Sequence, residues 1–534
     1  MTVNGFNQTL AVMIRENAAK FPGLPVLTFV DEPYPDEILT YADIESKGNR
    51  LANSVIDAGI CSGDKVAIIM KNHPEAILAL YATSLIGAVL VPLDPHSSGD
   101  KLGYQLRHAG AKGVFFSLDI LDRMMTVLEA LPHIHILGVR TKNIPDSVIP
   151  DGFPDLDQVL NETTPSQLKL TPTSNKNLMI IYTPGTTGIP KGVMIDQNQW
   201  DSQKAIHRQI CKYKKTDIIF TSLPLAYGNA WKICILPALT IGIRAVVSRE
   251  FSSKHIWDIC RRHHCNIISC FGGHLSDFYA QPVTKFDGDN PVKTVISSNT
   301  PKKIWRAFEK RFQVKIHEWY LTMEGGIAHN PPGTGPVGSF GKPLESCCDM
   351  KVLRDDGTDC EPNEPGELAF KLKKASGESI YFKPLDADRT IQKDGWIRTA
   401  DIVHKDENGW LFFDSRKKDQ LSQGEFILAR EIEEVIVQYP QIKHVAVYGV
   451  RLVSGSTDHQ DTVTSVVPER NVQLSIEGLI QWCRERLPLE NIPTYIQIVD
   501  RIPKTGTEKI LYRQLESDFQ INGPDVYYSN DYIS

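Results

Sequence analysis

Short apolar runs alternate with helical patterns along the first part of the chain. The runs typical of buried strands are residues 66–70, 88–93, 113–118 and 134–139. Apolar residues at helical spacing lie between them, as at 75–87 and 102–110. Strand–helix alternation brings parallel strands together under covering helices. We therefore predict an α/β fold with mostly parallel sheets and helices on both faces.

The same pattern returns between residues 215 and 300. Its apolar runs are 216–224, 243–248, 265–270 and 292–298, and its helical patterns are 257–263 and 275–281. A second run of alternation predicts a second sheet. The first part of the chain should thus be one large domain of stacked sheets.

One uncharged stretch, Ala76–Leu93, is nearly long enough to cross a bilayer. Gly87 and Pro92 interrupt it, and its end is rich in β-branched residues. These features favour a buried helix that leads into a buried strand, so we predict no transmembrane segment. The first 17 residues lack the basic leader and apolar core of a signal peptide.

The pattern changes after about residue 340. Residues 350–372 are typical of a hairpin with turns at Asp-Gly and Pro-Gly. Residues 410–426 join a strand to a run of alternating charge, which we interpret as a linker. Helical and strand patterns then alternate to the end of the chain, which predicts a small α+β domain. The predicted domains are residues 1–414 and residues 417–534.

The composition narrows the class of protein. The chain has 534 residues, 41% of them hydrophobic and 23% charged, as in soluble proteins of several domains. A net charge of -6 argues against a nucleic-acid partner, because phosphate binding needs a basic excess. The ten cysteines form no CxxC pairs. Free thiols favour a cytoplasmic location. A homodimer is left open.

The stretch YTPGTTGIPKGV, residues 182–193, carries the first chemical signal. It follows the apolar run 178–182 and holds three Gly, three Thr and one Lys. Small side chains leave backbone N–H groups free to converge on one anion, and Lys191 can add a positive charge. This pattern predicts a phosphate-binding loop. It is not the Walker pattern, because Gly192 follows the lysine.

The complete string resembles YTSGTTGxPKGV of the adenylate-forming superfamily, which includes acyl-CoA synthetases, peptide-synthetase adenylation domains and luciferases. Pro184 replaces the usual Ser. Six further matches follow in the family's order: LPLAYG (223–228), WYLTMEGG (319–326), GSFGKP (338–343), GWIRTADIV (395–403), GWLFFDSRKKD (409–419) and PKTGTEKI (503–510). Their spelling is similar to that of the crotonobetaine/carnitine-CoA ligase subgroup.

The resemblance implies a fold and a two-step reaction. The fold is a large N-terminal domain of stacked sheets with a distorted β-barrel, and a small mobile C-terminal domain. A carboxylic acid reacts with ATP to give acyl-AMP and pyrophosphate, and a thiol, usually that of CoA, then displaces AMP. The implied small molecules are therefore the acid, ATP, Mg²⁺ and CoA.

The resemblance also assigns site residues. Those expected to bind ATP or AMP are Thr183, Gly185, Thr186, Thr187, Gly188, Lys191, Ser298, Tyr320, Glu324, Asp401, Arg416 and Lys509. Glu324 and Thr187 would hold Mg²⁺, a cation that prefers oxygen ligands. Asp401 would accept the ribose hydroxyls. Lys509 would bridge the acid and the phosphate, so the expected catalytic residues are Lys509, Glu324 and Thr187.

The acyl and CoA sites rest on a second group: Tyr227, Gly228, Lys232, Gly272, Gly325 and Gly424. No Asp stands in YGNAWKICI, residues 227–235, which disfavours an amino-acid substrate. Lys232 is the only charged residue there. It could pair with a second carboxylate of the substrate, but we favour an ammonium that simply reaches solvent.

Several positions depart from the family pattern: Pro184, Leu321, Met323, Ala400 and Ser415. An ungapped count from Gly409 puts Arg416 at the family's ribose-binding Arg, and a rival count would put Ser415 there. Two other functions thus stay open. One is acyl transfer to a carrier-protein thiol, and the other is a nucleotide-binding homologue that has lost catalysis. Every charged residue that the chemistry needs is nevertheless present.

Overall fold

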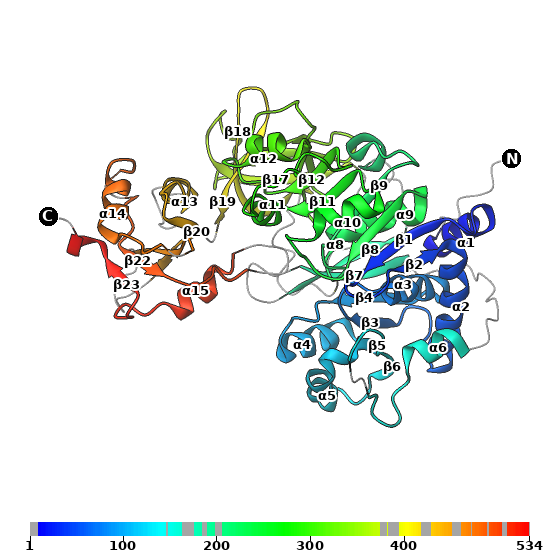
Figure 1. Cartoon of the computed structure of the whole chain (residues 1–534). Coiled ribbons are helices and arrows are strands. Elements are labelled where there is room, and N and C mark those ends of the chain that lie inside the picture. The colour runs from blue at the N-terminus through cyan, green and yellow to red at the C-terminus, as the bar shows by residue number, and fades with distance from the viewer. Residues whose placement is uncertain are drawn as a thin grey trace. The chain divides into compact units, whose positions relative to one another are not determined.

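The computed structural model describes residues 9–145, 148–162, 176–183, 190–197, 206–373, 382, 395–417, 429–450, 461–470, 472–488, 491–504 and 510–532. The chain divides into two compact units (Figure 1). Unit 1 comprises Met1–Asp349 and Leu372–Arg389, and unit 2 comprises Met350–Lys371 and Thr390–Ser534. The predicted boundary at residues 414–417 remains a prediction.

Unit 1 contains a six-stranded sheet. Its strands are β3 (Lys65–Ile69), β4 (Val89–Leu93), β5 (Ala111–Ser117), β6 (His135–Arg140), β7 (Asn177–Thr183) and β8 (Lys191–Asp196), in the order β6-β5-β3-β4-β7-β8. All neighbours are parallel except β7 and β8, which pair antiparallel. The four strand patterns between residues 66 and 139 are thus confirmed.

A second row of strands in unit 1 has a parallel centre and antiparallel ends. In spatial order the strands are β15 (Ser339–Pro343), β14 (Ile327–Asn330), β13 (Lys315–Leu321), β12 (Thr294–Ser298), β11 (Ile267–Phe271), β9 (Ile218–Thr221), β10 (Arg244–Ser248), β1 (Pro25–Val30) and β2 (Glu37–Thr40). The strands from β13 to β1 run parallel. The second predicted sheet is therefore present.

Helices cover these sheets on both faces. The main ones are α1 (Leu10–Lys20), α2 (Tyr41–Asp57), α3 (Pro74–Ile86), α4 (Gly99–Ala109), α5 (Leu121–Glu129), α6 (Leu156–Glu162), α10 (Ile256–His263), α11 (Gly272–Tyr279) and α12 (Trp305–Phe312). Ala67 and Ile69 of β3 share one buried cluster with α4 and α5, while Val66 and Ile68 share another with α2 and α3. Successive residues of a strand point to opposite faces, so both faces of this sheet are buried.

Helix α3 explains the uncharged stretch. Nearly all of its side chains are buried, Gly87 ends it with a φ of 73°, and β4 begins two residues later. A glycine tolerates this left-handed conformation without strain. The predicted helix and strand are thus confirmed. Among the described helices, none is both long enough and apolar enough to span a bilayer.

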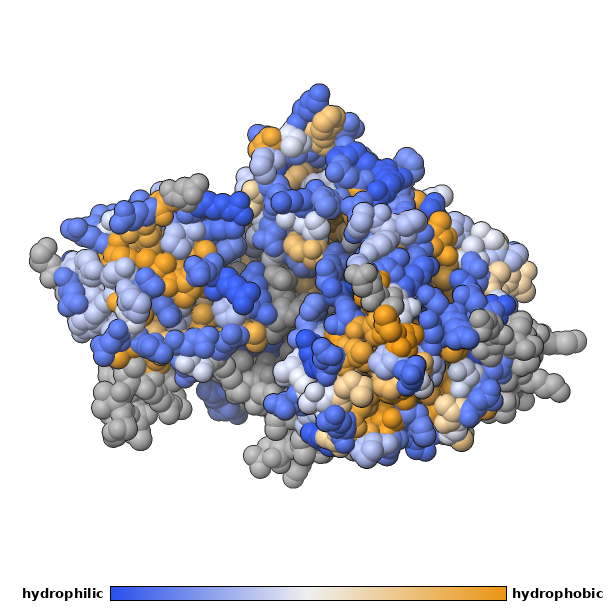
Figure 2. All heavy atoms as spheres, turned by 60° about the horizontal axis from the view of Figure 1, so that its bottom comes forward, coloured by the Kyte–Doolittle hydropathy of each residue, from blue (hydrophilic) through white to orange (hydrophobic). Residues whose placement is uncertain are grey.

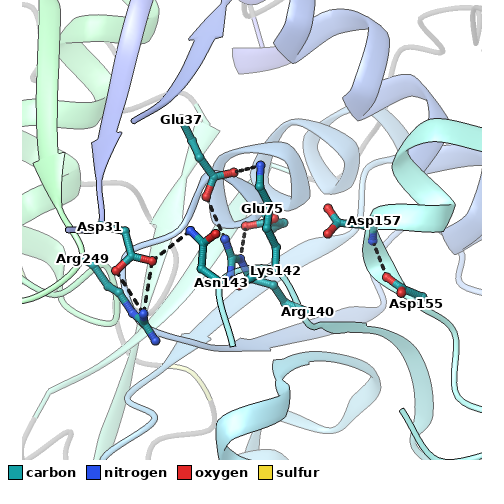
Figure 3. A network of polar contacts seen from close by, with 9 residues as sticks. All are labelled: Asp31, Glu37, Glu75, Arg140, Lys142, Asn143, Asp155, Asp157 and Arg249. Atoms are coloured by element: carbon teal, nitrogen blue, oxygen red, sulfur yellow. Dashed lines mark hydrogen bonds and ion pairs between the residues drawn. The ribbon is translucent and has the colours of Figure 1, made fainter. Parts of the chain in front are cut away.

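A buried arginine holds the end of β6 to two other elements of unit 1 (Figure 3). Arg140 is 1% exposed. Its Nε donates to Glu75 Oε2 of α3 at 3.0 Å, and its Nη2 donates to Glu37 Oε1 of β2 at 2.8 Å. Its Nη1 donates to the carbonyl oxygen of Lys142. A buried charge is tolerated when it is paired in this way.

Unit 2 holds two groups of strands. The first is β16 (Cys348–Leu353), β17 (Gly366–Leu372), β18 (Ile397–Lys405) and β19 (Leu411–Arg416), adjacent in that order. β16 ends its sheet, so the described strands form an open sheet and not the expected distorted β-barrel. Closure would require β16 to pair with a further strand on its free side.

The rest of unit 2 is a small α+β domain, as predicted. Its strands β20 (Ile442–Val450), β21 (Asp461–Pro468), β22 (Tyr495–Ile498) and β23 (Val526–Tyr528) are adjacent in sequence order. Helices α13 (Ala429–Ile436) and α14 (Ile476–Arg484) share a buried cluster with β20, β21 and β22. Helix α15 (Tyr512–Asp518) contributes Leu515 to a second cluster with β20 and β21.

The surface carries apolar as well as polar side chains. Figure 2 shows apolar residues gathered on the face of unit 1 where Figure 1 places α5 and β6. On α5 itself, Met125 is 37% exposed. Apolar atoms make up about half of any folded protein's surface, so this face is ordinary in kind.

Candidate active site

The two ends of the Gly/Thr loop lie side by side. Thr183 ends β7, Lys191 begins β8, and the two residues are paired across the antiparallel register. The hydroxyl of Thr183 donates to the carbonyl oxygen of Lys191 at 3.5 Å. Gly185, Thr186, Thr187 and Gly188 lie outside the described residues. The structure thus brings together the Thr and the Lys that flank the predicted phosphate loop.

A small hollow adjoins the start of this loop. It encloses about 250 Å³, part of it open to solvent, and Thr183, Tyr227, Asp94 and Lys101 help to line it. The hydroxyl of Tyr227 donates to Asp94 Oδ2 at 2.7 Å, and burial raises the pKa of that hydroxyl well above its usual range. Tyr227 therefore stays neutral and holds β4 to the segment that follows β9.

Gly228 opens helix α8 (Gly228–Ala230), directly after Tyr227. A Cβ added at this glycine would lie 2.4 Å from the sulfur of Met323. The Met323 side chain therefore occupies the space that any larger residue at position 228 would need. This contact accounts for one departure from the family pattern, since the methionine packs against a residue that has no side chain.

Residues 321–326 form a tight turn between β13 and β14. The Thr322 N–H donates to the Gly326 carbonyl at 2.9 Å, and the Gly326 N–H donates to the Thr322 hydroxyl at 3.0 Å. Gly325 has a φ of 112°, a conformation open to glycine but strained for other residues. The turn fixes the backbone around Glu324, which is half-buried. Just before it, the ring of Tyr320 lies 4.9 Å from that of Phe340.

Lys232 lies in a single π-helical turn, η4 (Trp231–Ile235), that continues α8. It is 5% exposed, because the turn is buried throughout and carries nearly all of the side chain inside. Burial lowers the pKa of Lys232 to about 8, and the negative charge of Glu324 partly opposes this. Lys232 and Glu324 thus influence one another electrostatically.

The segments near residues 272 and 298 meet at backbone level. A Cβ added at Gly272 would lie 1.8 Å from the carbonyl oxygen of Asn299, so only glycine fits. Asn299 itself has a φ of 63°. The hydroxyl of Ser298 donates to the carbonyl oxygen of Trp319 at 3.0 Å, which ties β12 to β13. Ser298 is thus held one residue away from Tyr320, the predicted adenine contact.

In unit 2, Asp401 and Arg416 face each other across β18 and β19. Arg416 Nε lies 2.6 Å from Asp401 Oδ1, and Asp401 is 3% exposed. Opposite charges this close attract one another strongly where water is excluded. Ser415 pairs with Ile402 in the same register, and its buried hydroxyl has no hydrogen-bond partner in the described part of the chain. The geometry therefore joins Arg416, and not Ser415, to Asp401.

Ala400 stands in the left-handed region, with a φ of 57°. The family has glycine at this position, where such a conformation costs nothing. Here Glu367 supports it: the Ala400 N–H donates to Glu367 Oε1 at 3.1 Å. The other carboxylate oxygen of Glu367 accepts from Arg398 at 2.9 Å and from Lys417 at 3.3 Å. This network holds the backbone that presents Asp401.

Sequence reasoning missed Asp94 and Glu367. Asp94 lies 133 residues from Tyr227, and Glu367 lies 33 residues from Ala400. A single sequence carries no signal for pairs so far apart. Two predicted residues, Lys509 and Gly424, lie outside the described part of the chain, so their roles remain predictions.

The described residues fit a magnesium site only in part. Glu324 supplies an oxygen ligand, as Mg²⁺ prefers, and Thr187 lies outside the described residues. Within the described ranges, no three His, Cys, Asp or Glu side chains are grouped as a metal cage would require.

Comparison with known proteins identifies the family. The profile of the AMP-binding enzyme family matches residues 14–375, which is more than half of the chain. The chain belongs to the AMP-binding enzyme family. The profile of the AMP-binding enzyme C-terminal domain matches residues 431–509. The predicted membership of the adenylate-forming superfamily is thus confirmed.

Two curated relatives and one solved structure illustrate the AMP-binding family. Long-chain fatty acid transport protein 6 of Mus musculus is 25% identical, over 90% of this chain and 81% of that protein. The crotonobetaine/carnitine–CoA ligase of Escherichia coli is 23% identical, over 89% of this chain and 93% of that protein. An anthranilate CoA ligase in complex with anthranoyl-AMP has a TM-score of 0.84 at 18% identity, over 96% of this chain and 98% of the other.

Proposed function

We propose that this protein is an AMP-forming acid–CoA ligase. A carboxylate oxygen of the acid attacks the α-phosphorus of ATP, and the bond to pyrophosphate breaks. The thiol of CoA then attacks the acyl carbonyl, and AMP leaves. The observation that carries the proposal is the pairing of Thr183 with Lys191 at the two ends of the Gly/Thr loop, within a matched AMP-binding enzyme sequence.

Both substrates of the first step are anions, so the enzyme must offset repulsion. Lys191 and the loop N–H groups would bind the phosphates. Glu324, with Thr187, would hold Mg²⁺, which neutralises phosphate charge when bound. Lys509 would stabilise the charge where acid and phosphate meet. These roles need no covalent intermediate with the chain.

Four residues would hold the nucleoside. Tyr320 would stack on adenine, with Ser298 nearby on the next strand. Asp401 would accept hydrogen bonds from the ribose hydroxyls. Arg416, which already lies 2.6 Å from Asp401, would orient that carboxylate and reach the ribose itself.

Support also comes from the way the structure accommodates the departures from the family pattern. Met323 packs over Gly228, and Glu367 supports the backbone of Ala400. Arg416 contacts Asp401 although Ser415 replaces the usual Asp. A chain that had lost catalysis would have no need to keep these contacts. We therefore favour an active ligase with free CoA as the acceptor, working in the cytoplasm, where its ten free cysteines stay reduced.

The test is pyrophosphate release from ATP and Mg²⁺ against a panel of carboxylic acids, with and without CoA. We expect release with one class of acid, and acyl-CoA only when CoA is present. Lys509→Ala should abolish acyl-AMP formation yet leave transfer from preformed acyl-AMP to CoA, with Lys504→Ala as the matched control. Transfer only to a carrier-protein thiol would correct the acceptor. ATP binding without any pyrophosphate release would refute the ligase.

A further inference from the structure

Lys232 is a buried cation whose charge the described residues do not neutralise at close range. It is 5% exposed. No carboxylate of the described residues lies within the 4.0 Å of an ion pair, and the charge of Glu324 acts on it from farther away. An ammonium loses several kcal/mol of hydration when it is buried, so buried lysines are normally paired. The structure thus holds an ammonium that lacks a close anion.

Two neighbouring polar atoms share this lack of a partner. Asn229 Oδ1 and His207 Nδ1 are buried and have no hydrogen-bond partner in the described part of the chain. Asn229 precedes Lys232 by three positions, a spacing that puts two side chains on one side of a helix. The other ring nitrogen of His207, Nε2, lies 3.1 Å from the carbonyl oxygen of Lys232. Buried polar groups that lack a partner in the protein call for an explanation, and a polar ligand would supply one.

The position of Lys232 in the chain relates it to the reacting end of the substrate. It follows Gly228, which contacts Met323, and Met323 precedes Glu324. Glu324 is the proposed Mg²⁺ ligand beside the phosphates. The ammonium therefore lies close enough to Glu324 to interact with its charge.

We propose that Lys232 binds a second carboxylate of the substrate, so that the preferred acid is a dicarboxylic acid. This inference rests on the proposed function. The reacting carboxylate already meets two cations under that function, Mg²⁺ and Lys509. Lys232 is a further cation, and an anion on the substrate tail would give it the partner that it lacks.

The experiment compares matched acids in the pyrophosphate-release assay. The probes are the straight-chain dicarboxylates from malonate to adipate, their monomethyl esters, and monocarboxylates of equal length. We expect one dicarboxylate to exceed its ester by about tenfold or more in kcat/KM, as for a buried charged hydrogen bond. In Lys232→Met the ratio of kcat/KM for the dicarboxylate to kcat/KM for its ester should fall to about one. Lys142→Met, a surface variant, should behave as wild type.

Other results overturn the inference. Equal use of dicarboxylates and their esters by the wild type would refute it and leave the ligase intact. A uniform loss of all acids in Lys232→Met would make Lys232 a positioning residue for Glu324. If no acid releases pyrophosphate, the ligase fails, and thermal shift then decides the inference. A dicarboxylate that raises the Tm of the wild type but not of Lys232→Met supports it, and equal shifts refute it.

Discussion

Two buried cations of unit 1 differ in whether a carboxylate lies at ion-pair distance. Arg140 is 1% exposed and lies within 3.0 Å of two carboxylates, those of Glu75 and Glu37 (Figure 3). Lys232 is 5% exposed and has no carboxylate of the described residues within 4.0 Å. Among the described residues, one cation thus has carboxylate partners and the other has none at ion-pair distance.

This difference in pairing indicates where a ligand would bind. When the chain itself neutralises a buried charge, removing either partner leaves the other buried without compensation and lowers the free energy of unfolding. A buried charge that the chain does not neutralise costs stability, and it persists only if something outside the chain compensates. Pairing therefore separates structural charges from binding charges better than burial does.

The largest effect should come from breaking the paired cation. Arg140→Met leaves Glu75 buried without its partner, so we expect the free energy of unfolding to fall by about 3–5 kcal/mol. Urea denaturation measures this loss. Burial already raises the pKa of Glu75, and Arg140 opposes that rise. The double variant Arg140→Met with Glu75→Gln should recover part of the loss.

Lys142 supplies the matched surface control. Its ammonium lies 2.6 Å from Glu37 Oε2 but its side chain is 45% exposed. Removing it as Lys142→Met should cost about 1 kcal/mol or less. Equal losses of unfolding free energy for Arg140→Met and Lys142→Met would show that burial does not determine how much an ion pair contributes to stability.

The unpaired cation should behave in the opposite sense. Lys232→Met removes a buried ammonium, so we expect the unliganded variant to be as stable as the wild type or more so. The pKa of Lys232 is lowered from 10.5 to about 8. The unfolded chain then binds the proton more tightly, and wild-type stability rises with pH between about 8 and 10.5. Relative to Lys232→Met, this gain should be on the order of 3 kcal/mol.

Urea denaturation of both proteins across that pH range gives the measurement, and the difference between them cancels the titration of every other group. A constant difference from pH 8 to pH 10.5 would contradict an uncompensated ammonium. A variant much less stable than the wild type at pH 7 would mean that the chain neutralises Lys232 after all.

Asp401 offers the most specific effect. It is buried and paired with Arg416, like a structural charge, but we propose that it also binds ribose. Asp401→Ala should raise the KM for ATP about tenfold, as for one lost charged hydrogen bond, with little change in the KM for the acid. Initial rates at varied ATP measure it. An unchanged KM for ATP would leave Asp401 as a purely structural charge.

Much of the fold could be predicted from local pattern. Both parallel sheets were indicated by short apolar runs, since strands buried on both faces need such runs. The uncharged stretch that becomes α3 and β4 was predicted because Gly87 marks a helix end. The barrel was expected from family resemblance alone, and the described strands do not form it.

The site was predictable where a motif places its residues close together in the chain. Thr183 and Lys191 are separated by one short loop, and Asp401 and Arg416 by one hairpin. Long-range contacts were not predictable, as with Asp94 beside Tyr227 and Glu367 beneath Ala400. The burial of nearly all of the Lys232 side chain was not predictable, because a long side chain usually lies largely in water and only packing shows when it does not.

The conformation of Ala400 has a consequence for chirality. An L-residue in the left-handed region pays about 1–2 kcal/mol because its Cβ crowds the following carbonyl oxygen. Its mirror image would fit there without strain. A chain carrying D-alanine at this one position would keep the methyl group and the restricted backbone, and it would lose only the crowding. The strain at Ala400 thus comes from the chirality of its Cα, and the hydrogen bond to Glu367 helps to keep the backbone in this conformation.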